Sequence, residues 1–127
     1  MYRRSLQIVT AVLAAIPVVT GLVGMLGISD PLYASAGLPP SVLLDSNLRF
    51  FSGMWVGVGV AMYSLVPNIE KQTILFRALW SMVFLGGIGR LISMFMLAPP
   101  PAPFIGFTAH EIIGAPLMML WQAQVAE

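Results

Sequence analysis

An all-α fold of four membrane-spanning helices, packed as an integral membrane four-helix bundle, is predicted by three features of the sequence. Hydrophobic residues make up 58% of the chain and charged residues only 9%, whereas roughly 25% of the residues of an ordinary soluble domain are charged. Polar or proline-rich stretches divide the chain into apolar segments long enough to cross the roughly 30 Å hydrocarbon layer. These segments lie at residues 6–28, 48–66, 73–97 and 104–125. We therefore expect one transmembrane domain over residues 1–127.

The first apolar segment, residues 6–28, contains no charged residue and follows Arg3 and Arg4. A basic start before an apolar run also resembles a secretory signal peptide, and small residues at 34–36 provide a cleavage-like site. The apolar run is longer than the core of a usual signal peptide. An uncleaved first helix is therefore the simpler interpretation.

The second and third segments are bounded by residues that interrupt helices. Residues 29–47 contain prolines and a glycine and predict a loop. Asp45, Ser46 and Asn47 are candidate caps for a helix that starts at residue 48. A second, proline-rich loop is expected at residues 98–103, after the third segment.

Basic residues give the chain an expected orientation. The loops at residues 29–47 and 98–103 have no Lys or Arg. Cytoplasmic loops of membrane proteins carry the excess of Lys and Arg, so both termini are expected in the cytoplasm. The basic residues that decide this lie before the first segment and around the start of the third: Arg3, Arg4, Lys71 and Arg77.

Charge and cysteine content exclude several classes of function. The net charge is only +1 and forms no basic patch, so a nucleic-acid partner is not expected. The chain has no cysteine, which excludes disulfides, thiolate metal sites and iron–sulfur ligation. Any chemistry must come from carboxylate, Arg, His or hydroxyl groups.

Several glycines recur at helical spacing within the apolar segments. Small residues at such spacing let helix backbones approach closely, so we expect helix packing rather than a ligand cradle. The glycines to which we assign this role are Gly53, Gly57, Gly86, Gly89 and Gly114.

Five ionisable residues lie in or beside the apolar segments. In the expected orientation Arg90 and Glu111 each lie roughly 10 Å below the outer end of their helix, and Arg49 lies at an outer end. We therefore expect a polar cluster in the outer half of the bundle, with candidates for binding a ligand or partner. Its members are Asp45, Arg49, Arg90, His110 and Glu111.

Arg90 and Glu111 are the natural ion pair of this cluster. A charge at the centre of a membrane helix costs about 2.5–3.5 kcal/mol, so such residues face the bundle interior and pair. The pair could be a structural salt bridge or part of a ligand or proton site. If Asp45 stays in a solvated loop, Arg49 remains a free cation for an anionic lipid head group or a polar ligand atom.

Catalytic motifs are absent or incomplete in the sequence. His110 and Glu111 begin like the zinc-protease pattern H-E-x-x-H, but Gly114 stands at the fifth position and the chain has no second histidine. No serine triad, phosphate-binding loop or dinucleotide fingerprint is present. We expect no catalytic residue, no cofactor and no metal site. Acid or base work by Glu111, or a metal held by one His and two carboxylates, are weaker alternatives.

Three short motifs resemble a bacterial family of four-helix membrane proteins of unknown function in the DoxX-like group. They are the stretch from Asp45 to Gly57, the run from Gly86 to Arg90, and His110-Glu111. The similarity covers nearly the whole chain. It implies a four-helix protein of the inner (cytoplasmic) membrane with no established reaction. Some DoxX-like proteins are small subunits of quinone-linked oxidoreductases, which implies by analogy a quinone or protein partner.

The leading functional hypothesis is a non-enzymatic, accessory membrane protein that binds a lipid, a quinone or a larger membrane-protein complex. Further copies of the same chain, in a homo-oligomer, are also among the expected partners. The alternatives are a small transporter or proton-relay component, because ionisable residues lie at depth, and an intramembrane lipid-modifying enzyme that uses Glu111.

Overall fold

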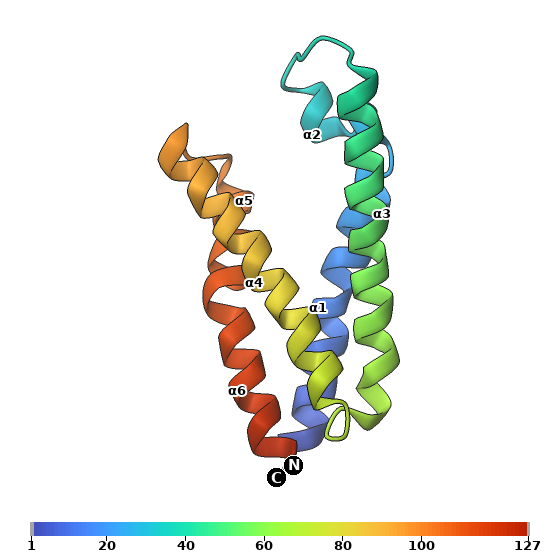
Figure 1. The fold of residues 1–127 in the computed structure, drawn as a ribbon, viewed down its shortest axis with the longest axis vertical. Coiled ribbons are helices and arrows are strands. Elements are labelled where there is room, and N and C mark those ends of the chain that lie inside the picture. Colours follow the sequence, from blue (N-terminus) through green and yellow to red (C-terminus); the bar gives the residue numbers. More distant parts are fainter. Residues whose placement is uncertain (1, 127) are drawn as a thin grey trace. The chain divides into compact units, whose positions relative to one another are not determined.

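The computed structural model describes residues 2–126, and this part of the chain is helical with no β-strand (Figure 1). Four of its helical stretches are long and apolar enough to cross a membrane, which confirms the prediction of four apolar helices. They are Tyr2–Gly24, Val42–Asn68, Thr73–Met96 and Ala102–Ala126.

The contacts of the chain divide it into two compact units. The N-terminal unit is Gln7–Val66, and the C-terminal unit takes the chain up to Leu6 and everything from Pro67 onward. The expectation of one transmembrane domain stays a prediction.

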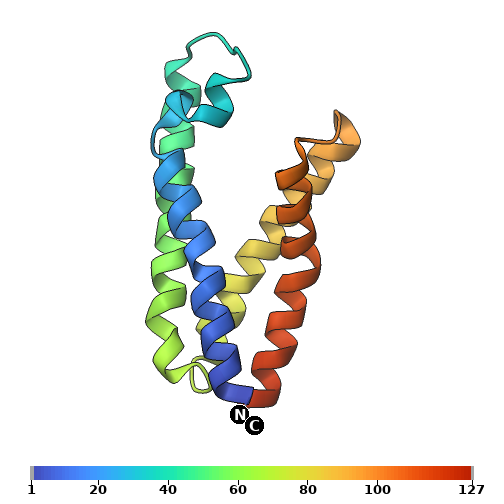
Figure 2. The ribbon, with the colours of Figure 1, turned by 180° about the vertical axis from the view of Figure 1, so that it is seen from behind.

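In the N-terminal unit α1 (Tyr2–Gly24) and α3 (Val42–Leu65) run side by side (Figures 1 and 2). Glycines allow this approach. A Cβ atom added to Gly21 would lie 2.9 Å from the carbonyl oxygen of Ser52, and one on Gly59 would lie 3.0 Å from that of Ala14. Small residues at such contacts let membrane helices pack backbone against backbone.

The start of α3 differs from the prediction. The helix begins at Val42 and not at residue 48, because Ser41 is its N-cap: the Ser41 hydroxyl accepts a hydrogen bond of 3.3 Å from the backbone N–H of Leu44. Asp45 lies in the first turn, where a negative charge is favourable. The predicted caps at 45–47 are thus inside the helix.

The predicted loop at 29–47 also contains helical turns. A 3-10 turn, η1 (Gly27–Ser29), is followed by the short helix α2 (Pro31–Ala34). Asp30 caps α2 by accepting a hydrogen bond of 3.0 Å from the N–H of Leu32, and Pro31 occupies the first turn. Proline is tolerated at a helix start because its missing N–H would be unpaired there anyway. The Asp-Pro pair therefore starts a helix instead of preventing one.

In the C-terminal unit α4 (Thr73–Met96) packs antiparallel against the last part of the chain (Figures 1 and 2). The turn between α3 and α4 contains a 3-10 turn, η2 (Val66–Asn68). The packed elements are α4 (Thr73–Met96), α5 (Ala102–Ala109), the π-helical turn η3 (His110–Gly114) and α6 (Ala115–Ala126).

Polar side chains fix the register at one end of this unit. The Gln122 side-chain amide donates to the carbonyl oxygen of Ile69 at 3.1 Å and to the hydroxyl of Thr73 at 2.9 Å. Arg3 donates to the carbonyl oxygen of Pro67 at 2.9 Å and pairs with Glu70 at 2.8 Å. The beginning of α1 and the end of α6 are therefore both attached to the turn that precedes α4.

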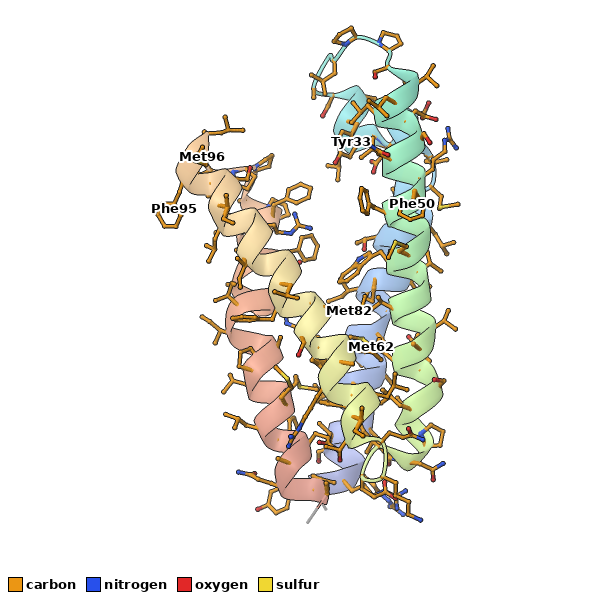
Figure 3. The ribbon with its side chains drawn as sticks, viewed as in Figure 1. Tyr33, Phe50, Met62, Met82, Phe95 and Met96 are labelled. Atoms are coloured by element: carbon orange, nitrogen blue, oxygen red, sulfur yellow. The ribbon has the colours of Figure 1, made fainter. Side chains whose placement is uncertain are left out.

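The inner face of α4 is apolar and follows helical spacing, with Phe76, Trp80 and Val83 buried. Its outer face is apolar as well. Figure 3 shows Phe95 and Met96 at the end of α4, where their side chains are 88% and 76% exposed. A monomeric soluble protein rarely exposes apolar surface on this scale, but hydrocarbon tails would cover it at no cost.

Candidate functional site

The site begins with a break in the regular hydrogen bonding of the last helical stretch. At η3 the backbone N–H of Ala115 donates to the carbonyl oxygen of His110, five residues earlier. Such π-helical turns are rare and occur frequently at functional sites. The turn contains His110 and Glu111, two of the five residues singled out by the sequence.

Two glycines provide the space that these side chains occupy. A Cβ atom on Gly87 of α4 would lie 2.7 Å from the Cβ of Glu111. A Cβ atom on Gly114 would lie 2.8 Å from Nδ1 of His110. Gly87 therefore lets Glu111 pack against α4, and Gly114 lets the His110 ring lie back along its own helix.

Glu111 pairs with Arg90, as the sequence predicts. Arg90 Nε lies 3.0 Å from Glu111 Oε2 and donates a hydrogen bond of 3.2 Å to Oε1. Oε2 is within ion-pair distance but accepts no hydrogen bond from the described residues. The Glu111 side chain is only 8% exposed, whereas that of Arg90 is 41% exposed. The carboxylate is thus the buried end of the pair and the guanidinium the accessible end.

Arg90 uses only part of its guanidinium within residues 2–126. Its Nε–H is taken by Glu111, and its Cζ lies 5.5 Å from the centre of the Phe104 ring, within cation–π range. The terminal nitrogens, Nη1 and Nη2, donate no hydrogen bond to the described chain. These N–H groups lie on the guanidinium edge that a ligand could meet.

His110 packs against an aromatic ring and not into the ion pair. Its ring lies edge-on to that of Trp80, with centroids 5.8 Å apart and planes at 75°. The Trp80 indole N–H is buried and has no acceptor among the described residues. The buried tryptophan is part of the packing of the C-terminal unit.

Asp45 and Arg49 form a second pair, in the N-terminal unit. Arg49 Nε donates to Asp45 Oδ2 at 2.8 Å. Its Nη1 donates to the carbonyl oxygen of Met25 at 2.7 Å, and its Nη2 to that of Leu26 at 3.1 Å. These carbonyls follow the C-terminus of α1, where a cation is favoured by the helix dipole. Arg49 therefore closes the end of a helix.

The chain reversal after α1 explains how Arg49 reaches these carbonyls. Gly27 has a positive φ of 63°, a backbone conformation that residues other than glycine rarely adopt. A Cβ atom there would also collide with the Asp45 carboxylate. The N–H of Ile28 then donates to Asp45 Oδ1 at 3.0 Å. The condition under which Arg49 would be a free cation, an Asp45 that stays in a solvated loop, is therefore not met: Asp45 lies in α3 and pairs with Arg49.

The structure thus brings the candidate residues together in two groups, one in each unit. The C-terminal unit holds Arg90, His110 and Glu111, and the N-terminal unit holds Asp45 with Arg49. A single five-residue cluster stays a prediction.

The glycines at close contacts are mostly not those that spacing selected. Within the described residues nothing lies within 4 Å of a Cβ built at Gly57, Gly86 or Gly89, and Gly53 makes only an ordinary contact of 3.5 Å with Met25. Spacing shows that glycines share a helix face but not which neighbour that face meets. Close approaches that spacing does not predict occur at Gly21, Gly24, Gly59 and Gly87.

Together these features define a helical protein with four helices fit to span a membrane and a partly exposed Arg–Glu pair beside a π-helical turn. Residues 5–122 match the model of a family described as a domain of unknown function, DUF4345, and the chain belongs to this family. Neither the curated proteins nor the solved structures that were searched contain a match to the chain.

Proposed function

We propose that the chain is a non-enzymatic, multi-pass protein that binds the polar head of a membrane amphiphile, a lipid or a quinone, through Arg90. The observation that supports this function is the divided guanidinium: Nε is held by buried Glu111, while Nη1 and Nη2 have no acceptor among the described residues. Glu111 is a positioning residue in this account. It fixes the plane and direction of the guanidinium and leaves the outer edge for the ligand.

The surroundings of Arg90 suit such a ligand. Hydrogen bonds are stronger in a medium of low dielectric, and a donor without an acceptor is costly there. Phe104 lies against one side of the guanidinium and is itself packed edge-to-face on Phe107, with centroids 6.0 Å apart. A few polar groups within an apolar lining are typical of small-molecule sites. An amphiphile would supply both an acceptor and an apolar body.

The wider context forms part of the same proposal. We place the protein in the inner membrane of a bacterium, with both termini in the cytoplasm, because the loops at residues 29–47 and 98–103 carry no Lys or Arg. The short motifs that resemble the DoxX-like group favour, by analogy, an accessory role in a larger membrane-protein complex. A homo-oligomer would be compatible with the same binding site.

Native mass spectrometry of protein extracted gently from its own membrane tests the proposed function. The wild-type chain should carry a bound lipid, quinone or protein, and Arg90→Gln should lose most of it. Arg77→Gln removes an exposed cation of the same helix and serves as the matched control. Retention that is equal in the wild type and in folded Arg90→Gln would contradict a ligand site at Arg90.

A proton relay is the second candidate, and one observation favours it. Glu111 Oε2 is buried without a hydrogen bond, and His110 is its neighbour in the same π-helical turn. A relay would also need a path for water. Proton flux into proteoliposomes that disappears in Glu111→Gln would support this function, and flux no greater than that of empty vesicles would exclude it.

A further inference from the structure

The charge around Arg90 determines which kind of head group the site can accept. Between Ala78 and Ala126 the chain has only three titratable side chains: Arg90, His110 and Glu111. With a neutral histidine the Arg90–Glu111 pair sums to zero. No other charged side chain of this stretch could balance a charge brought by a ligand.

From this balance we infer that the ligand head is an uncharged hydrogen-bond acceptor, an ester or ketone carbonyl, and not a phosphate or carboxylate; the inference rests on the proposed function. A carbonyl accepts from the Nη groups of Arg90 and leaves the sum at zero. A singly charged anion at the same place would leave a net charge of −1 within an apolar layer. From the cost of an unbalanced charge inside a membrane, this corresponds to a preference on the order of a hundredfold for the uncharged head.

The ion pair also limits the geometry with which an anion could bind. Arg binds phosphate and carboxylate most strongly through two parallel hydrogen bonds. The edge that contains Nε is occupied by Glu111, so only the edge between Nη1 and Nη2 remains. An anion there would lie on the same guanidinium as the Glu111 carboxylate, and the two negative charges would repel each other. A carbonyl oxygen meets no such repulsion.

A competition between two lipids that share their acyl chains and ester carbonyls, and of which only one carries an anionic phosphate, tests the inference. Delipidated wild-type protein would be offered equal amounts of a diacylglycerol and of the phosphatidic acid with the same acyl chains. Native mass spectrometry would then measure the ratio of the two bound lipids. We expect the diacylglycerol to be retained at least tenfold over the phosphatidic acid.

Glu111→Gln gives the matched variant, because it keeps the shape of the side chain and removes its charge. The site then has a net charge of +1, and the preference should reverse toward phosphatidic acid. Arg77→Gln, which leaves the ion pair intact, should keep the wild-type ratio. The wild-type competition is decisive even if the Glu111 variant does not fold.

The outcomes separate this inference from the proposed function. Binding of phosphatidic acid in preference to diacylglycerol by the wild type would overturn the inference and leave a ligand site at Arg90. Equal ratios in the wild type and in folded Glu111→Gln would overturn it as well. If neither lipid is retained more by the wild type than by Arg90→Gln, the binding function itself is contradicted and the inference falls with it.

Discussion

At the scale of single residues, the part of the Arg90 guanidinium that stays accessible depends on the absence of a side chain at Gly87. Glu111 can pack against α4 only because Gly87 has no side chain, and the buried carboxylate then holds Arg90 by its Nε. The glycine determines how close the helices come, and the closeness determines which guanidinium edge stays open. Gly89, two positions along, has nothing within 4 Å of an added Cβ among the described residues.

Gly87→Ala and Gly89→Ala form a matched pair of substitutions. We expect Gly87→Ala to lower the free energy of unfolding by about 1–3 kcal/mol, because an added methyl group overpacks a close helix contact. Gly89→Ala should be neutral or slightly stabilising, since alanine is the better helix former and meets nothing. Thermal unfolding in detergent compares the two. Equal losses in both variants would show that Glu111 does not pack tightly on α4.

The sequence predicts the Arg90–Glu111 pair because depth in an apolar helix can be counted from the helix end. It does not predict the hydrogen-bond partners of Arg49. If the chain after α1 were an open loop, Arg49 would have no carbonyl oxygen within reach. The turn at Gly27, with its positive φ, brings the carbonyls of Met25 and Leu26 within reach of Arg49. Such a contact between segments cannot be read from spacing along either one.

At the scale of secondary structure elements, the end of α1 depends on side chains of α3. Arg49 donates to the carbonyl oxygens of Met25 and Leu26, which directly follow α1, and Asp45 orients Arg49 and accepts from the backbone of η1. Helix ends leave their last carbonyls without partners inside the helix, so an external cation there stabilises the end.

Arg49→Gln should loosen the end of α1 without affecting the C-terminal unit. Hydrogen–deuterium exchange should become several-fold faster in the peptide covering residues 24–28, because Arg49 and the Asp45 carboxylate that it orients no longer hold this turn and its backbone N–H groups in place. Asn47→Ala, an exposed position of the same helix, is the control and should leave exchange unchanged. Unchanged protection in Arg49→Gln would contradict the capping role.

The elements differ in how well the sequence predicts them. Hydropathy and the prolines place α4 almost as observed, at Thr73–Met96 against the predicted 73–97. The π-helical turn η3 has no local signature, because the apolar pattern around it also fits a continuous α-helix. It lies where Glu111 and Ile112 pack against Gly87, and spacing along the last helix does not predict this contact with α4.

At the scale of the whole molecule, the account requires four crossings with the termini on one side of the membrane. Composition and length predict four apolar helices, and the structure contains them. The direction of insertion comes from the distribution of basic residues alone.

Single cysteines introduced into this cysteine-free chain test the crossings and their direction. A membrane-impermeant maleimide should label Gly37→Cys and Ala98→Cys in intact cells, because both lie in the loops expected outside. Gln72→Cys, an exposed position between the second and third spans, should be labelled only after the membrane is opened. The unsubstituted chain is the control. The reverse pattern would invert the orientation, and labelling of all three positions in intact cells would contradict the spans.

The central claim is that Arg90, and not Arg49, offers guanidinium N–H groups to a membrane ligand. Nitrogen-15 NMR of the arginine side chains tests this most directly, in delipidated protein titrated with a total lipid extract of the membrane that produced it. We expect the Nη resonances of Arg90 to shift while those of Arg49, held by Asp45 and two carbonyls, stay in place. Shifts at Arg49, or none at Arg90, would contradict the account.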